Sequence, residues 1–228
     1  MIEVTRSGDV HILTMAAGEN RFNPTMLAAF DEALTGVEQS EGPAAVVLTG
    51  QGKFFSNGLD LEWMMANVEQ GGPAEVANGL QALYRRVLTF PVATVAAMNG
   101  HAFAGGGMLA LACDQRVMRT ERGFFCLPEV DINIPFTNGM SKLIQAKLTP
   151  AAAYEVMLTG RRYGAEDAVA AGVVDAALPE DEVLPAAIER AQALAGKQRT
   201  TVAAIKQGMF DEVADALAET VGGLPGAS

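Results

Sequence analysis

The sequence has few of the side chains on which several common kinds of enzyme chemistry depend. Its 228 residues include two histidines, His11 and His101, and two cysteines. No serine stands in a G-x-S-x-G frame, which disfavours a serine hydrolase with a Ser-His-Asp triad. The isolated histidines and cysteines also lack the ligand spacing of a metal site. We therefore expect no metal, and we expect Cys113 and Cys126, which lie among apolar residues, to be buried thiols.

Basic residues and long apolar runs are scarce as well. Sixteen Lys and Arg stand against 27 Asp and Glu, a net charge of −11, which argues against nucleic acid or an anionic membrane as the main partner. No uninterrupted apolar run reaches the roughly 18 residues of a membrane span. No charged-then-apolar leader opens the chain. We expect a soluble cytoplasmic protein, and its last five residues, 224–228, do not form a Ser-Lys-Leu-type peroxisomal signal.

The spacing of apolar residues predicts alternating strands and helices in the first part of the chain. Residues 2–15 read as two short strands around a turn at residues 7–9. Asn23 and Pro24 begin a helix, with apolar positions at helical spacing up to Val37. Residues 44–50 and 92–100 form buried strands that end in glycine, and a helical stretch at about 75–89 lies between them. This alternation implies parallel strands covered by helices, an α/β fold.

The second part of the chain is dominated by alanine-rich helices. With half of its residues hydrophobic, the chain is long enough for one sizeable core. From about Asn138 onward strand signals nearly vanish. We expect a core at residues 1–147 that carries the chemistry, and a helical region at 148–228 for packing and oligomerisation. A helical cap on the same core is an equal alternative.

Three consecutive glycines stand directly before an apolar helix. Gly100 and Gly105 have the spacing of a phosphate-binding loop, but Gly106 and Gly107 occupy the positions where Lys and Ser or Thr are required. The first N–H groups of a helix have no partner within the helix, and the helix dipole makes that end positive. The glycines let a ligand oxygen approach these N–H groups without obstruction by side chains.

A second corner of this kind follows the strand at residues 44–50. Asn57 and Gly58 form a turn there, and Asp60 caps the next helix. Two strand-to-helix corners can direct two N–H groups at one oxygen. Such an oxyanion hole stabilises the developing charge of acyl chemistry by about 3–4 kcal/mol per donor. The alternative is that both corners are merely tight turns.

Glu129 is the candidate base for such a site. It lies between Pro128 and Val130 in a largely apolar stretch, where burial raises a carboxyl pKa toward the working pH, as a general base requires. Asp131 is a local competitor. The alternative for Glu129 is a solvated position in a surface loop.

Taken together, these segments resemble the crotonase superfamily, the enoyl-CoA hydratase/isomerase family. The resemblance covers nearly the whole chain, in three ordered motifs: KFFSNGLDLEWM, PVATVAAMNGHAFAGGGMLALACDQRVM and GRRYGAEDAVAAGVVDAALP. Within the family, SNGLDL, GGGMLALACD and PEVDI are most similar to Δ3,Δ2-enoyl-CoA isomerases.

The resemblance implies a fold and a set of site residues. It implies a crotonase-like spiral of ββα units whose last helices pack within a homotrimer or a dimer of trimers. It also implies that the substrate is an acyl-CoA thioester, so that coenzyme A enters with the substrate and no further cofactor is expected. The resemblance further implies that the N–H groups of Leu59 and Gly106 hold the thioester oxygen and that Glu129 is the acid and base. The implied substrate-binding residues are Arg21, Ser56, Asn57, Gly58, Asp60, Leu61, Gly105, Gly107, Leu109, Phe136 and Lys206, of which we interpret Asp60 as a helix cap.

One departure from the hydratase pattern points to the reaction. Hydratases of this family carry a first glutamate two residues after the glycine triplet, where this sequence has Leu109, and a second at the position of Glu129. Moving a double bond needs only one base, which removes a proton from C2 and returns it to C4. We therefore expect an isomerase. A hydratase or another crotonase reaction, and a catalytically silent acyl-CoA-binding oligomer, are the alternatives.

A second departure concerns the acyl pocket. Hydratases usually have a glycine-rich loop where this chain has residues 134–138. Phe136 either lines the pocket and excludes water or packs against the C-terminal helices. For the CoA phosphates, Lys206 resembles a family lysine and Arg21 lies near a segment that often borders CoA. A solvated surface charge is the alternative for each.

Overall fold

The computed structural model describes residues 1–222. A six-stranded sheet has the order β1-β2-β3-β5-β7-β9, with β1 antiparallel at one edge and all other neighbours parallel. A second sheet of three short parallel strands has the order β4-β6-β8. The strands span β1 Ile2–Ser7, β2 Val10–Met15, β3 Ala45–Gly50, β4 Phe54–Ser56, β5 Ala93–Met98, β6 His101–Phe103, β7 Gln115–Arg119, β8 Phe125–Cys126 and β9 Ala176–Leu178.

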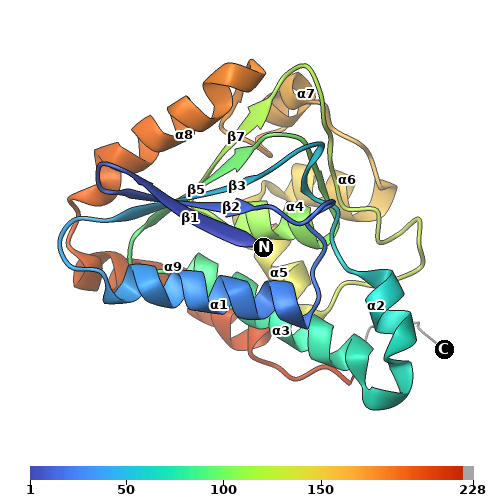
Figure 1. The fold of residues 1–228 in the computed structure, drawn as a ribbon. Helices are drawn as coiled ribbons and strands as arrows, with labels where there is room; N and C mark the ends of the chain where they lie inside the picture. Colours follow the sequence, from blue (N-terminus) through green and yellow to red (C-terminus); the bar gives the residue numbers. More distant parts are fainter. Residues whose placement is uncertain (223–228) are drawn as a thin grey trace.

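The helices cover both faces of the large sheet (Figure 1). On one face α8 packs alone against the alternate side chains of β2, β3, β5 and β7. On the other face α1, α3 and α4 bury the larger core. The helices span α1 Pro24–Gln39, α2 Leu61–Ala66, α3 Gly72–Leu88, α4 Gly105–Ala112, α5 Asn138–Lys147, α6 Pro150–Thr159, α7 Ala165–Ala170, α8 Glu180–Ala195 and α9 Arg199–Leu217, with a single 3₁₀ turn η1 at Val68–Gln70.

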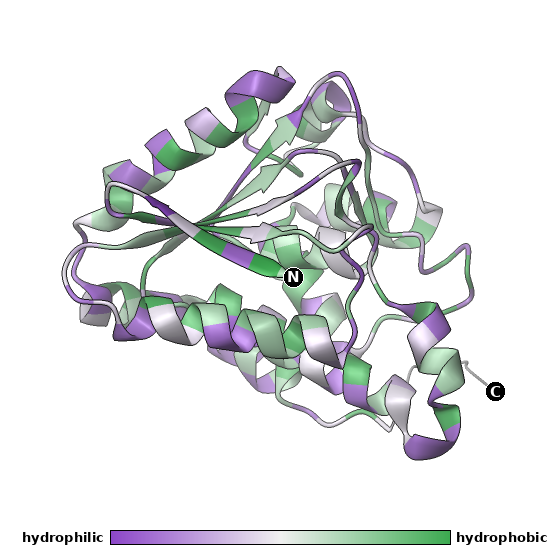
Figure 2. Ribbon diagram, in the orientation of Figure 1, coloured by the Kyte–Doolittle hydropathy of each residue, from purple (hydrophilic) through white to green (hydrophobic). Residues whose placement is uncertain are grey.

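Hydropathy follows these layers. The outer helices carry polar residues along one side and apolar residues toward the sheet, most visibly along α8 and α1 (Figure 2). By contrast, α4 is buried along its entire length. An eight-residue helix with no polar face is a core element. In the part of the chain that the structure describes, no helix is both long and apolar enough to cross a membrane.

The small sheet positions the site. Its three parallel strands end at Ser56, Phe103 and Cys126, and the carboxyl ends of parallel strands meet at one edge. The two glycine corners and the segment that carries Glu129 follow these three ends directly. Segments more than 70 residues apart in the sequence are thereby brought together.

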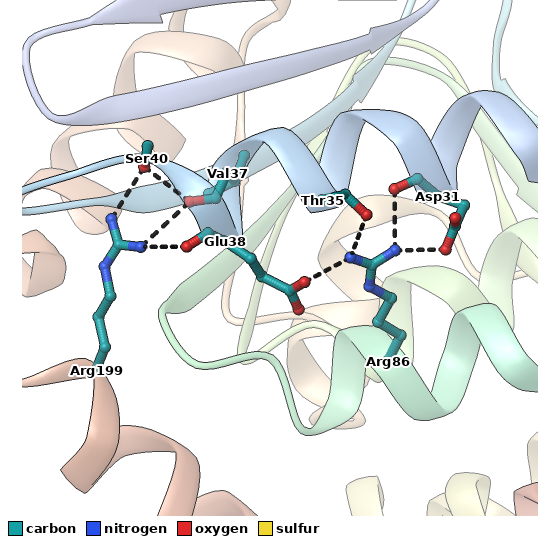
Figure 3. A network of polar contacts seen from close by, with 7 residues as sticks. All are labelled: Asp31, Thr35, Val37, Glu38, Ser40, Arg86 and Arg199. Carbon is teal, nitrogen blue, oxygen red and sulfur yellow. Dashed lines mark hydrogen bonds and ion pairs between the residues drawn. The ribbon is translucent and has the colours of Figure 1, made fainter.

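Two arginines hold α1 in place (Figure 3). Arg86 of α3 donates to the side chains of Asp31, Thr35 and Glu38 at 2.6–2.9 Å. Arg199, at the start of α9, donates to the carbonyl oxygens of Val37 and Glu38 at the end of α1, and to Ser40 and Gly42 beyond it. Arg199 therefore gives the Glu38 carbonyl a partner at the helix end and adds a donor to the Val37 carbonyl, which also accepts from Ser40.

Several predictions from the sequence are confirmed. The first two strands form an antiparallel hairpin, and the Asn23 side chain caps α1 by accepting from the N–H of Met26 at 3.0 Å. The α/β class and the helices of the second half are also confirmed. The short strands β4, β6, β7 and β9 were not predicted.

Contacts in the large sheet link the two predicted regions, residues 1–147 and 148–228. Strand β9 joins the large sheet, and Val183, Ala187 and Ala191 of α8 pack into one cluster with Val47 and Val95. Helix α8 therefore packs on the sheet that the first part of the chain forms, and the division at residue 147 stays a prediction. An oligomerisation role for residues 148–228 stays a prediction, and the prediction on residues 224–228 lies outside the described residues.

The packing of Gly106 against the end of β4 gives a first prediction. A Cβ on Gly106 would lie 2.5 Å from the Ser56 carbonyl oxygen and 2.6 Å from the Ser56 Cβ. We expect Gly106→Ala to destabilise the fold by about 1–3 kcal/mol through overpacking, a fall in Tm of roughly 3–10 °C for a chain of this size. Gly208→Ala is the matched control, because a Cβ there meets no atom within 4 Å and alanine favours the helix. Equal Tm values for the two variants would contradict the close packing.

Candidate functional site

A cavity of about 250 Å³ lies at the carboxyl edge of the small sheet. The two glycine corners and the segment after β8 both contribute to its wall. Apolar side chains of α3, α4 and α5 close its inner end. We call it the central cavity. Its lining residues are Arg21, Asn57, Leu59, Leu61, Leu80, Phe103, Ala104, Gly105, Met108, Pro128, Glu129, Ile132, Ile134, Pro135 and Met140.

The first corner is held by a buried polar network. The Asn20 amide donates to the carbonyls of Phe54 and Phe55 at 3.0 and 3.1 Å, and the Ser56 hydroxyl donates to the Asn20 carbonyl at 2.7 Å. Gly58, with φ +79°, takes a conformation that L side chains rarely adopt. The N–H of Leu59 makes no hydrogen bond within residues 1–222. It is thus a free donor on the cavity wall.

The second corner is strained. Ala104 has φ +47° and ψ −119°, a conformation that costs a residue with a Cβ about 1–3 kcal/mol. This turn begins α4, and the N–H groups of Gly105 and Gly106 have no partner within the described residues. A Cβ on Gly58 would lie 2.9 Å from the Ala104 Cβ and 3.2 Å from the Gly105 nitrogen. The two corners are therefore in direct contact.

Glu129 lines the same cavity as the two corners. The turn that holds it is fixed by backbone hydrogen bonds from Asp131 and Ile132 to the Pro128 carbonyl and from Ile134 to the Glu129 carbonyl. Its side chain is buried, with 6% exposed, and its Oε2 has no hydrogen-bond partner among the described residues. Burial raises the pKa of this carboxyl to about 7. The solvated alternative for Glu129 is wrong.

The other candidate acids and bases lie elsewhere. Asp131, the local competitor, is exposed and does not line the cavity. Neither His11 nor His101 lines it. Both cysteines are buried and free, and burial raises the pKa of Cys113 to about 12 and that of Cys126 to about 11. Among the residues that line the cavity, Glu129 is the only titratable acid.

The mouth of the cavity carries a cation in a small polar network. Arg21 lines the mouth and contacts Glu19 at 2.6 Å, and the same Glu19 oxygen accepts from the Asn57 amide at 2.8 Å. The hydrogen bonds from Asn57 and Arg21 lower the pKa of Glu19. Arg21 is therefore positioned beside the first corner, and its contact with CoA stays a prediction.

Several predicted site residues stand behind the wall of the central cavity. Ser56, Gly58, Gly106 and Gly107 build the corners without lining it, and Leu109 is fully buried in the core. Their predicted contacts with substrate stay predictions. The N–H of Gly106 belongs to the first turn of α4, which leaves it without a partner within the helix.

Asp60 and Phe136 also lie outside the cavity lining. Asp60 accepts from the N–H of Trp63 at 3.1 Å and from the Asn23 amide at 2.9 Å, which confirms the helix-cap interpretation. Phe136 is half-buried and packs against the large core. Of its two alternatives, the packing role fits the structure better than the pocket role.

Lys206 is not brought to the cavity. Its ammonium is buried and donates to a carboxylate oxygen of Asp114 at 2.7 Å and to the Val92 carbonyl at 3.0 Å. The alternative of a solvated surface charge is therefore wrong, because the ammonium is buried against Asp114, which lies 92 residues away in the sequence. A CoA-binding role for Lys206 within the same chain is not supported by this position.

The sequence-based reasoning missed the residues that shape the inner end of the cavity. Leu80 of α3, Met108 of α4 and Met140 of α5 line it, and nothing in the sequence distinguishes these apolar residues from ordinary core residues. It also missed Asn20, which is fully buried with φ +53°. A buried asparagine in a left-handed conformation is typical of a turn. The nearby Gly18, with φ +62°, is the residue in the sequence from which this turn could have been predicted.

The raised pKa of Glu129 predicts how stability depends on pH. The folded state holds the proton with a pKa of about 7 against an ordinary value of 4.5, so it binds more protons than the unfolded state between these values. Stability therefore falls as the pH rises through this window, by up to about 3 kcal/mol. Glu129→Gln removes this contribution. Urea unfolding at pH 5 and pH 8 measures it.

The comparison needs a control for other titrating groups. Asp131→Asn removes an exposed carboxylate two residues away, and its stability should change with pH as that of the wild type does. If the wild type and Glu129→Gln have parallel profiles between pH 5 and 8, burial of an ionisable Glu129 is ruled out.

Comparisons with known proteins place this geometry in a family. The model of the enoyl-CoA hydratase/isomerase family matches residues 6–222. The chain is 34% identical over 227 residues to enoyl-CoA delta isomerase 2, peroxisomal, of Arabidopsis thaliana, which covers 93% of each chain. It is 37% identical over 200 residues to a putative enoyl-CoA hydratase of Thermus thermophilus, which covers 86% of this chain and 76% of that one.

A solved structure agrees. The fold is similar to that of a probable enoyl-CoA hydratase from Mycobacterium tuberculosis, with a TM-score of 0.87, 27% identity and coverage of 95% of this chain and 91% of the other. The family model and the relatives extend over nearly all of the residues that build the two sheets and the central cavity. The chain belongs to the enoyl-CoA hydratase/isomerase family, the crotonase superfamily.

Proposed function

We propose that this chain is a Δ3,Δ2-enoyl-CoA isomerase that moves a double bond from C3 to C2 of an acyl-CoA thioester. The observation that carries the proposal is that Glu129, buried and the only acid among the described residues that line the cavity, shares this cavity with the two backbone corners. The Arabidopsis relatives named enoyl-CoA delta isomerases, 33–34% identical to this chain, support the same reaction.

The reaction uses the corners as the electrophile. The thioester oxygen accepts hydrogen bonds from the N–H groups of Leu59 and Gly106, which stabilise negative charge on that oxygen. Glu129 removes one proton from C2, and the electron pair of that C–H bond delocalises over the thioester and the C3–C4 double bond as a dienolate. The protonated carboxyl then gives the proton to C4, which leaves a double bond between C2 and C3. Atoms and charge balance with no other reactant.

The environment of Glu129 suits both steps. With a pKa of about 7, the carboxyl is substantially ionised near neutral pH and can accept the C2 proton. Once protonated it is also acidic enough to return that proton, because a general acid–base works best with a pKa near the operating pH. Leu80, Met108 and Met140 enclose the inner end of the cavity with apolar surface, which disfavours water as a competing reactant.

Hydration is the main alternative, because several relatives are named hydratases. A hydratase of the pattern described above activates water with two carboxylates. Among the described residues that line this cavity, Glu129 has no acidic neighbour, and Leu109 is buried in the core. The geometry therefore favours the one-base reaction. Binding of acyl-CoA without turnover is the remaining alternative.

Coenzyme A enters only as part of the substrate in this proposal. Arg21 at the mouth is the cation placed to meet its phosphates. We also propose a homotrimer or a dimer of trimers, which the exposed apolar side chains of Tyr154 and Leu158 on α6 and Ile205 and Met209 on α9 support.

A two-substrate assay tests the proposed reaction. Purified protein is given a 3-enoyl-CoA or, separately, a 2-enoyl-CoA, and the absorbance of the conjugated thioester is followed. We expect conjugation to appear from the 3-enoyl substrate and to persist with the 2-enoyl substrate. Rapid loss of the 2-enoyl signal would identify a hydratase. Tight binding without change in either substrate would identify a silent acyl-CoA-binding protein.

Substitution of the base gives a second prediction. Glu129→Gln should lower kcat for isomerisation by about 10²–10⁴-fold, the usual contribution of a general acid–base. In the wild type, kcat/KM should rise with pH to a plateau, with its midpoint near the pKa of about 7, since the ionised form is the base. Asp131→Asn is the matched control and should retain wild-type activity. Unchanged turnover in Glu129→Gln would refute Glu129 as the base.

A further inference from the structure

Tyr84 lies directly behind the second corner. It belongs to α3, is fully buried and does not line the central cavity. Its hydroxyl donates a hydrogen bond to the carbonyl oxygen of Gly105 at 2.9 Å. A Cβ on Gly105 would lie 3.0 Å from the Tyr84 oxygen, so glycine at this position allows the Tyr84 hydroxyl to approach the backbone closely.

The accepting carbonyl is joined to the proposed oxyanion donor. The carbonyl of Gly105 and the N–H of Gly106 are the two ends of one planar peptide unit. A hydrogen bond donated to the carbonyl polarises that unit and strengthens the N–H as a donor, the cooperativity of hydrogen-bonded chains in a low-dielectric interior. The same contact fixes the orientation of the peptide from behind.

We propose that Tyr84 is a positioning residue of the oxyanion hole, which orients and polarises the Gly105–Gly106 peptide for the thioester oxygen. The inference rests on the proposed function and adds a residue that never touches the substrate. The resulting chain of hydrogen bonds runs from the Tyr84 hydroxyl through the Gly105–Gly106 peptide to the thioester oxygen of the ligand.

The hydroxyl is directed to the corner and not to the base. No hydrogen bond joins Tyr84 to Glu129 within residues 1–222, and Oε2 of Glu129 has no partner there. Burial, with a smaller contribution from the charge of Glu129, raises the pKa of Tyr84 well above its ordinary value, so the phenol stays protonated as a donor. Loss of the hydroxyl should therefore weaken the hole and leave the titration of Glu129 in place.

Tyr84→Phe keeps the ring and removes only the hydroxyl. Tyr163→Phe is the matched control, because Tyr163 is also fully buried and its hydroxyl donates to Glu155, which does not line the cavity. The carbonyl stretching frequency of bound 2-enoyl-CoA, measured with an isotope label in the thioester carbonyl, reports on polarisation by the hole without requiring turnover.

We expect the bound carbonyl of the wild type to shift to lower frequency than in water, and this shift to shrink in Tyr84→Phe but not in Tyr163→Phe. Loss of the hydroxyl should lower kcat by about 3- to 10-fold, the effect of one neutral hydrogen bond, with KM nearly unchanged. The midpoint of the pH–rate profile should stay in place. If Tyr84→Phe does not fold, Tyr84→3-fluorotyrosine, a stronger donor, should increase the carbonyl shift.

Each contrary result has a distinct meaning. If the carbonyl frequency of 2-enoyl-CoA does not shift on binding to the wild type, the oxyanion hole and the proposed function are both contradicted. A shift that is present in the wild type and equally large in Tyr84→Phe would overturn the role of Tyr84 alone. A displaced pH midpoint in Tyr84→Phe would also overturn it, since the hydroxyl would then act through Glu129.

Discussion

The contact between the two backbone corners is the constraint on which the site depends. Gly58, with φ +79°, approaches Ala104 and Gly105 so closely that a Cβ on it would lie 3.2 Å from the Gly105 nitrogen. The strained backbone of Ala104 persists because the surrounding structure fixes it from several sides. The Asn20 amide donates hydrogen bonds to the Phe54 and Phe55 carbonyls before the first corner. The parallel strands of the small sheet fix the two corners relative to each other. The N–H of Leu59 and those of the first turn of α4, none of which has a partner among residues 1–222, are thereby brought together at one cavity.

The rest of the site follows from this arrangement. Because the backbone provides the electrophile, the helix behind the second corner needs no polar side chain and can be buried along its whole length. One carboxyl is then sufficient for the chemistry. Its burial among apolar residues raises its pKa into the range in which it can both take and return a proton. Packing of the core and tuning of the base are thus two consequences of the same apolar surroundings.

The sequence could predict the elements with strong periodicity, and it could predict the corners from their glycines. The three-residue strands β4 and β6 carry too little periodic signal to be recognised, yet they help to bring the site together. The sequence also could not decide between buried and solvated positions for Glu129 and Lys206, since each outcome depends on contacts with distant segments. Tyr84 meets Gly105 only because α3 turns that face toward α4.

The central claim is that one shielded carboxyl carries out both proton transfers, and isotope transfer tests it most directly. A 3-enoyl-CoA with deuterium on C2 is converted in ordinary water in a single turnover, and the product is examined for deuterium at C4. A single carboxyl in an apolar cavity predicts that part of the label removed from C2 appears at C4. A product whose new C4 hydrogen comes entirely from water, even at the shortest times, would contradict the account and require a second proton donor.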